Sequence, residues 1–203
     1  MRLACVPALT AALLLAACGT TTDPGATAPT TAPPVVAVPA DGPVTGVGTV
    51  IEKPGGPPEL CLGPVAESWP PQCEGVPLSG WSWAEHEPEQ VADTDSMSTS
   101  WGSFAVTGTF DGLVLTVTDA VPLALYDTVA EPTPSRAPTP RLTEQEWAAV
   151  SEGVRAAPGL LTVDRPGDTG PVQVAVVHDD GSVQAWADAS FGVGAVVVTS
   201  ALR

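Results

Sequence analysis

Carboxylates concentrate in the segment from residue 85 to residue 95. The acidic residues there are Glu85, Glu87, Glu89, Asp93 and Asp95. Glu85 paired with Asp93 or Asp95 would suit the acid and base of a glycosidase-like hydrolase. Asp93 and Asp95 with backbone carbonyls would suit a weak Ca²⁺ site. The segment lacks the central glycine and final glutamate of an EF-hand, and acid-rich loops are typically solvated, so we assign no metal ligands.

Six tryptophans stand beside a single tyrosine. Trp69 precedes two prolines, and Trp81 and Trp83 fall on the same face of a predicted strand. Exposed indoles would form a stacking platform for a sugar or a peptide, whereas buried indoles would fill a small β domain. Together with the carboxylates, these tryptophans give a possible binding surface of Trp69, Trp81, Trp83, Glu85, Glu87, Asp93 and Asp95.

Other chemistry finds little support in the sequence. No nucleophile elbow, S-x-x-K motif, glycine-rich phosphate loop or nicotinamide fingerprint occurs, so we predict no catalytic residue and no cofactor. The two histidines, His86 and His178, are interpreted as residues of solvated polar loops. Asp and Glu number 23 against 7 Lys and Arg, a formal net charge of −16. That balance excludes nucleic acid and anionic lipid surfaces as electrostatic partners.

Residues 44–127 are predicted to form an all-β domain. Strands are expected at 44–52, 59–65 and 76–83, followed by a hairpin over 104–118. The Asp111-Gly112 pair predicts a two-residue turn that places Phe110 opposite Leu113. In that register Gly108 faces Leu115 and Val106 faces Val117. Five short strands favour a small antiparallel barrel of OB-like type, with a small sandwich as the alternative.

A second unit is predicted over residues 143–203, after a Pro-rich linker at 128–142. Thr143 and Glu146 form a capping box at the start of a helix, which Pro158-Gly159 ends. Strands follow at 160–164, 172–178 and 194–200. Residues 182–191 are either a helix or a return strand, and the apolar spacing favours the helix. The order α-β-β-α-β predicts a ferredoxin-like unit, with 121–127 as its possible first strand. The overall prediction is an α+β protein.

The first 17 residues have a positive Arg2, an apolar run and the ending Leu15-Ala16-Ala17 before Cys18. These residues resemble the signal peptide and lipobox of bacterial lipoproteins. The resemblance implies that Cys18 carries a diacylglycerol after cleavage, which anchors the protein on the extracytoplasmic face of the cell membrane. Residues 18–43 are rich in Thr, Pro and Ala and are expected to form a tether.

The remaining cysteines are interpreted in that light. Cys5 would leave with the signal and Cys18 would take the lipid, so Cys61 and Cys73 remain as an even pair in an exported chain. This pair predicts one disulfide. The text from Glu59 to Cys73 resembles a cassette of small lipoproteins and secreted proteins from actinobacteria. That resemblance supports the location and the disulfide and transfers no catalytic residue.

The function expected from these observations is that of a non-catalytic binding or adaptor module of the cell envelope. Its partners would be the membrane, through the lipid on Cys18, and an envelope protein or wall polymer of unknown identity. The alternative is a carboxylate-dependent cell-envelope hydrolase that uses Glu85 with Asp93 or Asp95.

Overall fold

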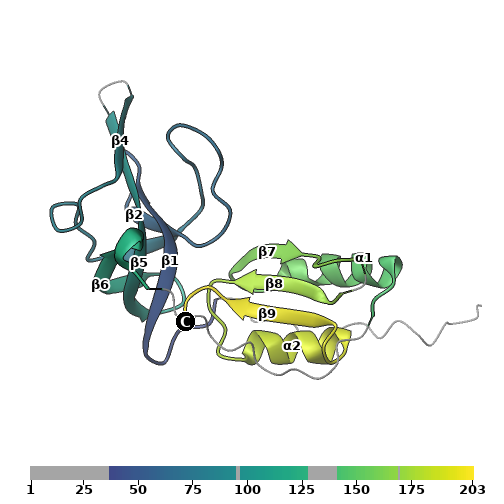
Figure 1. Cartoon of the computed structure of the whole chain (residues 1–203). Helices are drawn as coiled ribbons and strands as arrows, with labels where there is room; N and C mark the ends of the chain where they lie inside the picture. Colours follow the sequence, from purple (N-terminus) through teal and green to yellow (C-terminus); the bar gives the residue numbers. More distant parts are fainter. Residues whose placement is uncertain (1–36, 95–96, 128–140, 169) are drawn as a thin grey trace, which may run out of the picture.

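The computed structural model describes residues 37–94, 97–127, 141–168 and 170–203 (Figure 1). Within these ranges the chain forms a mixed α+β fold with two sheets, which confirms the predicted class. The first sheet contains β1 (Pro43–Glu52), β2 (Pro58–Cys61), β3 (Val76–Ser79), β4 (Gln90–Thr94), β5 (Met97–Phe110) and β6 (Leu115–Pro122), and the short 3-10 helix η1 (Leu123–Leu125) follows. The second unit contains α1 (Glu144–Gly153), η2 (Val154–Ala156), β7 (Leu160–Asp164), β8 (Val172–Val176), α2 (Ser182–Phe191) and β9 (Val196–Ser200).

The first sheet has the order β1-β2-β3-β6-β5-β4, and β1 also pairs with β5. β3 and β6 run parallel, whereas the other paired strands are antiparallel. β5 is the longest strand: its first residues pair with β4, and the stretch from Ser100 onward pairs with β1. Alternate residues of β5, among them Phe104, Val106 and Phe110, are buried in the main core. This alternation follows from the period of two in a strand.

The register predicted for the β5–β6 hairpin is wrong by two residues. Phe110 lies opposite Leu115, and Gly108 lies opposite Val117, so the connection has four residues instead of two. Beyond Gly108 the register shifts further, and Val106 faces Ala120.

A side-chain turn explains the longer loop. Oδ1 of Asp111 accepts hydrogen bonds from the backbone N–H groups of Val114 (2.8 Å) and Leu113 (2.9 Å). These two bonds lower the pKa of the Asp111 carboxyl below its ordinary value. An aspartate side chain can accept the hydrogen bonds that a backbone carbonyl would accept in a tight turn. Asp111 does so here, and the connection has four residues where a two-residue turn was expected. Leu113, predicted to face the core, is 68% exposed.

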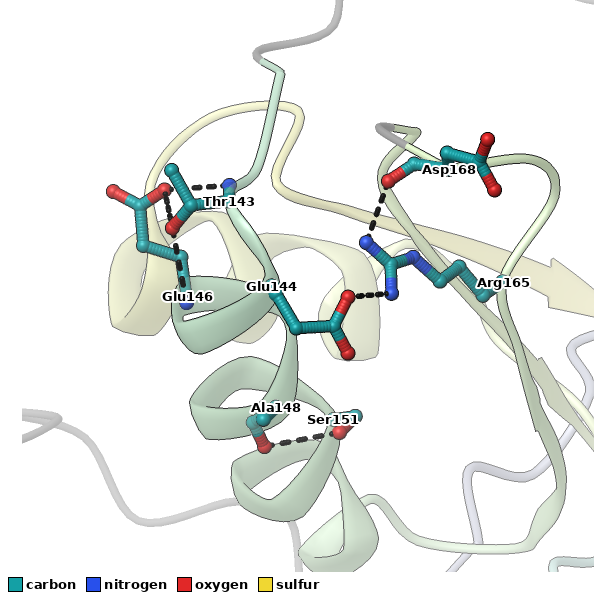
Figure 2. Close-up of polar contacts among 7 residues, drawn as sticks. All are labelled: Thr143, Glu144, Glu146, Ala148, Ser151, Arg165 and Asp168. Carbon is teal, nitrogen blue, oxygen red and sulfur yellow. Dashed lines mark hydrogen bonds and ion pairs between the residues drawn. The ribbon is translucent and has the colours of Figure 1, made fainter.

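In the second unit the predicted order α-β-β-α-β is confirmed. α1 begins at the expected capping box: Oγ1 of Thr143 accepts from the Glu146 N–H, and the Glu146 carboxylate accepts from the Thr143 N–H (Figure 2). The bonds from Thr143 lower the pKa of Glu146. Residues 182–191 form α2, as the apolar spacing favoured, and Val183 and Trp186 are among its buried residues.

The ferredoxin-like sheet order is not observed. β7 pairs antiparallel with β8, and β8 pairs directly with β9 in parallel. A ferredoxin-like unit would place another strand between those two. Residues 121–127 do not supply that strand, because Val121 and Pro122 end β6 and Leu123–Leu125 form η1. The observed unit is therefore a β-α-β crossover through α2 with β7 added at one edge.

Arg165, in the connection after β7, ties that connection to α1. Its guanidinium donates to the Glu144 carboxylate and, at 2.5 Å, to the carbonyl of Asp168, as Figure 2 shows. The same guanidinium lies 5.0 Å above the ring of Trp147. A cation over an indole face gains electrostatic attraction in addition to the ion pair. Arg165 thus fixes the edge of the small sheet against α1.

The second unit has a core of its own, but it also contributes residues to the core of the first sheet. Val177 and Leu202, both from the second unit, are buried with the apolar residues of the first sheet. The backbones of Thr45 and Arg203 exchange two hydrogen bonds, with N···O distances of 2.6 and 3.1 Å. Figure 1 places the C-terminus beside β1, at the junction of the units. The last residues of the chain therefore complete the core of the first sheet.

Candidate functional site

The predicted disulfide between Cys61 and Cys73 is confirmed, with the two Cα atoms 6.0 Å apart. It closes a loop between β2 and β3, which is further held by a backbone bond from Ala66 N–H to the Gln72 carbonyl. Below this disulfide loop lies a small core in which Ile51 and Trp101 are buried with Cys61. The bridge and this core fix the loop over the face of the sheet.

Trp69, at the tip of the disulfide loop, is 69% exposed. Its ring meets the buried Trp101 of β5 edge-on, with centroids 4.9 Å apart and planes at 82°. An edge-to-face contact of this kind is a favoured arrangement of aromatic rings. The contact with Trp101 favours this orientation of the Trp69 indole, while most of its surface stays in solvent.

A groove of about 560 Å³ is lined by Pro70, the neighbour of Trp69 in the chain, and by other residues of the disulfide loop; the two tryptophans are not part of its lining. Its lining residues come from the β1–β2 connection, the disulfide loop with the residues just after it, and β5; they are Lys53, Pro54, Pro70, Pro71, Gln72, Cys73, Glu74 and Thr99. We call it the proline groove. Its volume falls within the range of roughly 300–1,000 Å³ of small-molecule sites. Thr99 and Trp101 are two residues, or about 7 Å, apart on one face of β5, and Trp101 in turn contacts Trp69.

Lys53 joins the two walls of the proline groove. Its Nζ donates to the carbonyl of Cys73 at 3.0 Å and to Oε2 of Glu59 at 3.3 Å. The ammonium reaches from the connection after β1 to the end of the disulfide loop. It is also the only lysine of the chain. Lys53 therefore links the two walls of the groove, and Glu59 compensates the charge of its ammonium group.

Thr99 provides the floor of the groove and was missed by the sequence analysis. It is 5% exposed, and its hydroxyl has no hydrogen-bond partner among the described residues. The pairing of β1 with β5 ends at Ser100, so Thr99 lies just past the point where β1 leaves the sheet. Alternation along β5 predicts the burial of Thr99, but the departure of β1 depends on tertiary structure. The Thr99 oxygen is not among the fully buried polar atoms without a partner, so it is reached from the groove and is available to a ligand there.

Trp81 and Trp83 do not lie on a strand, contrary to prediction. β3 ends at Ser79, and Gly80 takes a φ of +81°, which favours glycine and turns the chain. Both rings pack against the main core, and Trp81 meets the ring of Phe104 edge-on at 5.0 Å. Their indole nitrogens are buried without a partner among the described residues. These two tryptophans therefore serve packing, apart from Trp69.

The predicted acidic loop is divided by β4. Glu85 and Glu87 are exposed in the connection before it, Asp93 is exposed on β4 opposite Ser98, and Asp95 lies outside the described residues. Oε2 of Glu89 accepts a hydrogen bond from Ser103 at 3.3 Å. In the part of the chain that the structure describes, no three His, Cys, Asp or Glu side chains gather as a metal site would require.

The histidines are more buried than their interpretation as solvated loop residues implies. His178 is buried between the units: its Nδ1 lies 3.0 Å from the carbonyl oxygen of Val38, and its ring meets Phe110. The imidazole of His86, half-buried, stacks on Trp81 with centroids 4.6 Å apart. Burial against aromatic rings assigns both residues to packing.

The predicted lipid site, Cys18, lies outside the described residues. Across the described ranges, no helix has both the length and the apolar character needed to cross a membrane. Comparisons of the chain with protein-family models, with curated proteins and with solved structures found no match. Its function is therefore argued from the geometry of its own residues.

Proposed function

We propose that the chain is a non-catalytic binding module of the cell envelope and that the proline groove, with Trp69 at its rim, is its ligand site. One observation carries this proposal. A large aromatic side chain is held in solvent by Trp101, beside a groove whose floor is the unpartnered hydroxyl of Thr99. Solvent exposure of a fixed indole gives no stability of its own, whereas it provides a flat apolar surface for a partner.

The location belongs to the same proposal. The lipobox-like ending before Cys18 supports cleavage and lipidation there, and residues 18–36 would hold the described units away from the membrane. The last part of the predicted tether is not a spacer, because Ala37 and Ala40 pack against the core of the first sheet and Val38 packs against the core of the second unit. The ligand would then be an envelope protein or a wall polymer on the extracytoplasmic face. Substitution Cys18→Ala is expected to release the protein from the membrane fraction into the medium. Retention of that variant in the membrane would contradict the lipid anchor.

We infer in addition that the first sheet closes into an OB-like barrel. The support is the set of pairings: β1 bonds to β2 and to β5, and the path β2, β3, β6, β5 joins these two neighbours. When β4 is left out, the other five strands are adjacent in the order β1-β2-β3-β6-β5. This order and the parallel pairing of β3 with β6 fit an OB-like barrel. OB-like barrels bind oligonucleotides and oligosaccharides across loops and one sheet face. The strong negative charge disfavours nucleic acid here.

Binding is favoured over the hydrolase alternative by the placement of the carboxylates. A general acid needs a carboxyl whose surroundings raise its proton affinity. Glu85 and Asp93 are exposed, and their carboxylates make no hydrogen bond or ion pair with the described residues. The proline groove contains a single described carboxylate, Glu74, so it offers no pair for acid and base chemistry.

The test is capture of purified cell-wall material by the protein. Trp69→Ala and Thr99→Val are expected to lower capture, because one removes the stacking surface and the other removes the floor hydroxyl. Leu113→Ala is the matched control: it also removes an exposed apolar side chain, but it follows the far end of β5, roughly 35 Å along the strand from Thr99. Equal capture by all three variants and the unaltered chain would refute the assignment of the site.

A further inference from the structure

We infer that the ligand of the proline groove is a neutral glycan chain. This inference rests on the proposed binding function and concerns the chemical class of the ligand. Three features of the groove lead to it: the shape of the apolar surface, the polar groups at the floor, and the charge.

The apolar surface suits a pyranose ring. The edge contact with Trp101 leaves the Trp69 indole 69% exposed, so a flat face remains available. A pyranose has an apolar face of C–H groups that can lie on an indole, with its hydroxyls pointing outward around the ring. The lining prolines Pro54, Pro70 and Pro71 add aliphatic surface without further aromatic rings. Grooves that recognise proline-rich peptides are instead lined by aromatic side chains.

The polar groups of the groove suit hydroxyls. The Thr99 hydroxyl is able to donate one hydrogen bond and accept others, and it has no partner among the described residues. The exposed Gln72 amide, also in the lining, both donates and accepts. A sugar hydroxyl has the same double capacity, so it can pair with either group in either direction. A site with a few such polar groups in an otherwise apolar lining is the usual composition of a small-molecule pocket.

The charge of the groove selects against ionic polymers. Lys53 is the one cationic side chain in the described lining, and its ammonium is already held by Glu59 and by the Cys73 carbonyl. A polyanion would therefore meet no free cation while it approaches a chain with a net charge of −16. Phosphate-rich wall polymers and acidic peptides are disfavoured for this reason, and the neutral backbone of a glycan is not.

The experiment is isothermal titration calorimetry of the full chain, purified in detergent, with the tetramer of N-acetylglucosamine as the neutral probe. Two further arms use polyglycerol phosphate and a polyproline peptide. We expect the neutral oligosaccharide to bind, with an affinity that is nearly independent of salt because no ion pair forms. Trp69→Ala should weaken this affinity about tenfold or more, since the stacked ring is lost. Trp69→Phe should restore part of it.

Thr99→Val tests the floor, because it replaces the hydroxyl by a methyl group of similar volume. A several-fold loss of oligosaccharide affinity is expected, with the urea midpoint of the variant shown to be close to that of the unaltered chain. Gln72→Ala removes the other neutral polar group of the lining and serves in case the valine disturbs folding, since Gln72 is exposed.

The outcomes separate the two levels of the proposal. If cell-wall capture depends on Trp69 but the neutral oligosaccharide gives no heat, the glycan assignment is overturned and the binding module stands. If the polyproline peptide or polyglycerol phosphate binds more tightly than the neutral oligosaccharide, and this binding depends on Trp69, the glycan assignment is likewise overturned and the binding module stands. If neither wall material nor any probe binds in a manner that depends on Trp69, both the site and the ligand class are wrong.

Discussion

The substitution Leu202→Ala tests whether the two units of the chain are stable only together. Leu202 is completely buried, although it is the penultimate residue of the chain. It belongs to the core of the first sheet, whose last strand ends at Pro122. An added Cβ at Gly46 of β1 would come within 2.6 Å of Leu202 Cδ2, so this side chain packs directly against the backbone of β1. Truncation to alanine leaves a cavity between the units.

The expected cost follows from burial. Leucine-to-alanine substitutions at buried sites lower the free energy of unfolding by about 2–5 kcal/mol. Tight packing against β1 restricts collapse of the cavity, so we expect about 3 kcal/mol or more here. With a urea m-value of about 2 kcal/mol/M, the unfolding midpoint should fall by about 1.5 M. Leu202→Met conserves volume and should cost less than about 1.5 kcal/mol.

Urea unfolding followed by far-ultraviolet circular dichroism and by tryptophan fluorescence gives the measurement. Tryptophans occur in both units, so the two probes report on the whole described chain. We expect one transition that moves equally in both signals. Leu125→Ala is the control, because Leu125 is exposed and its loss should change stability by no more than about 0.5 kcal/mol. If Leu202→Ala moves the midpoint no further than this control, the shared core does not stabilise the protein.

Three other changes have defined outcomes. Thr143→Ala should lower the free energy of unfolding by about 1 kcal/mol in thermal melts, because α1 loses its cap. Because folding lowers the pKa of Glu146, its ionised carboxylate stabilises the folded state above the unfolded-state pKa, and this stabilisation is lost as the pH falls through the folded-state pKa. The difference in stability between Thr143→Ala and the unaltered chain should therefore become smaller in acid. Gly108→Ala should prevent accumulation of folded protein, since its Cβ would lie 2.1 Å from a carbonyl oxygen of β6. Replacing both Cys61 and Cys73 by serine should lower the free energy of unfolding by about 3 kcal/mol, and a reductant should then have no further effect on the midpoint.

Local patterns in the sequence predicted the elements well. The strand at Pro43–Glu52 and the helices α1 and α2 depend on signals a few residues apart: alternation of apolar residues, a capping box and an i, i+3, i+4 stripe. The disulfide was predicted from the pair of cysteines that remains if the chain is exported, and it is present. These features were accessible because each is determined by neighbouring residues or by a simple chemical rule.

Errors arose where a side chain or a distant segment decided the outcome. Asp111 bonded to two backbone N–H groups and lengthened a hairpin loop that the Asp-Gly pair alone predicted to be tight. His178 was interpreted as a solvated loop residue, but the backbone of Val38 and the ring of Phe110 cover it. No sequence pattern near His178 predicts those contacts, because Val38 and Phe110 are far from it in the chain.

The candidate site was predicted in part for the same reason. Composition identified the tryptophans as unusual but could not tell the exposed ones from the buried ones. Trp69 is exposed at the tip of a loop, whereas the turn at Gly80 directs Trp81 against the core. Thr99 carries no sequence signal that distinguishes it from the other threonines of the chain. Its importance comes from the end of the β1–β5 pairing, which leaves the Thr99 side chain as the floor of a groove.

The groove is therefore a product of three constraints that act on one place. The pairing of β1 with β5 ends at Ser100, so β1 does not cover Thr99. The disulfide holds the loop that contains Trp69 against the same face of the sheet, and the hydrogen bond from Lys53 to the Cys73 carbonyl links the two walls of the groove. Each constraint restricts the unbound site to the geometry that a ligand would meet, so little side-chain or loop ordering remains to oppose binding. On the proposal made above, a strongly acidic protein would in this way bind a neutral polymer by shape and by pairing of hydroxyl groups, without charge complementarity.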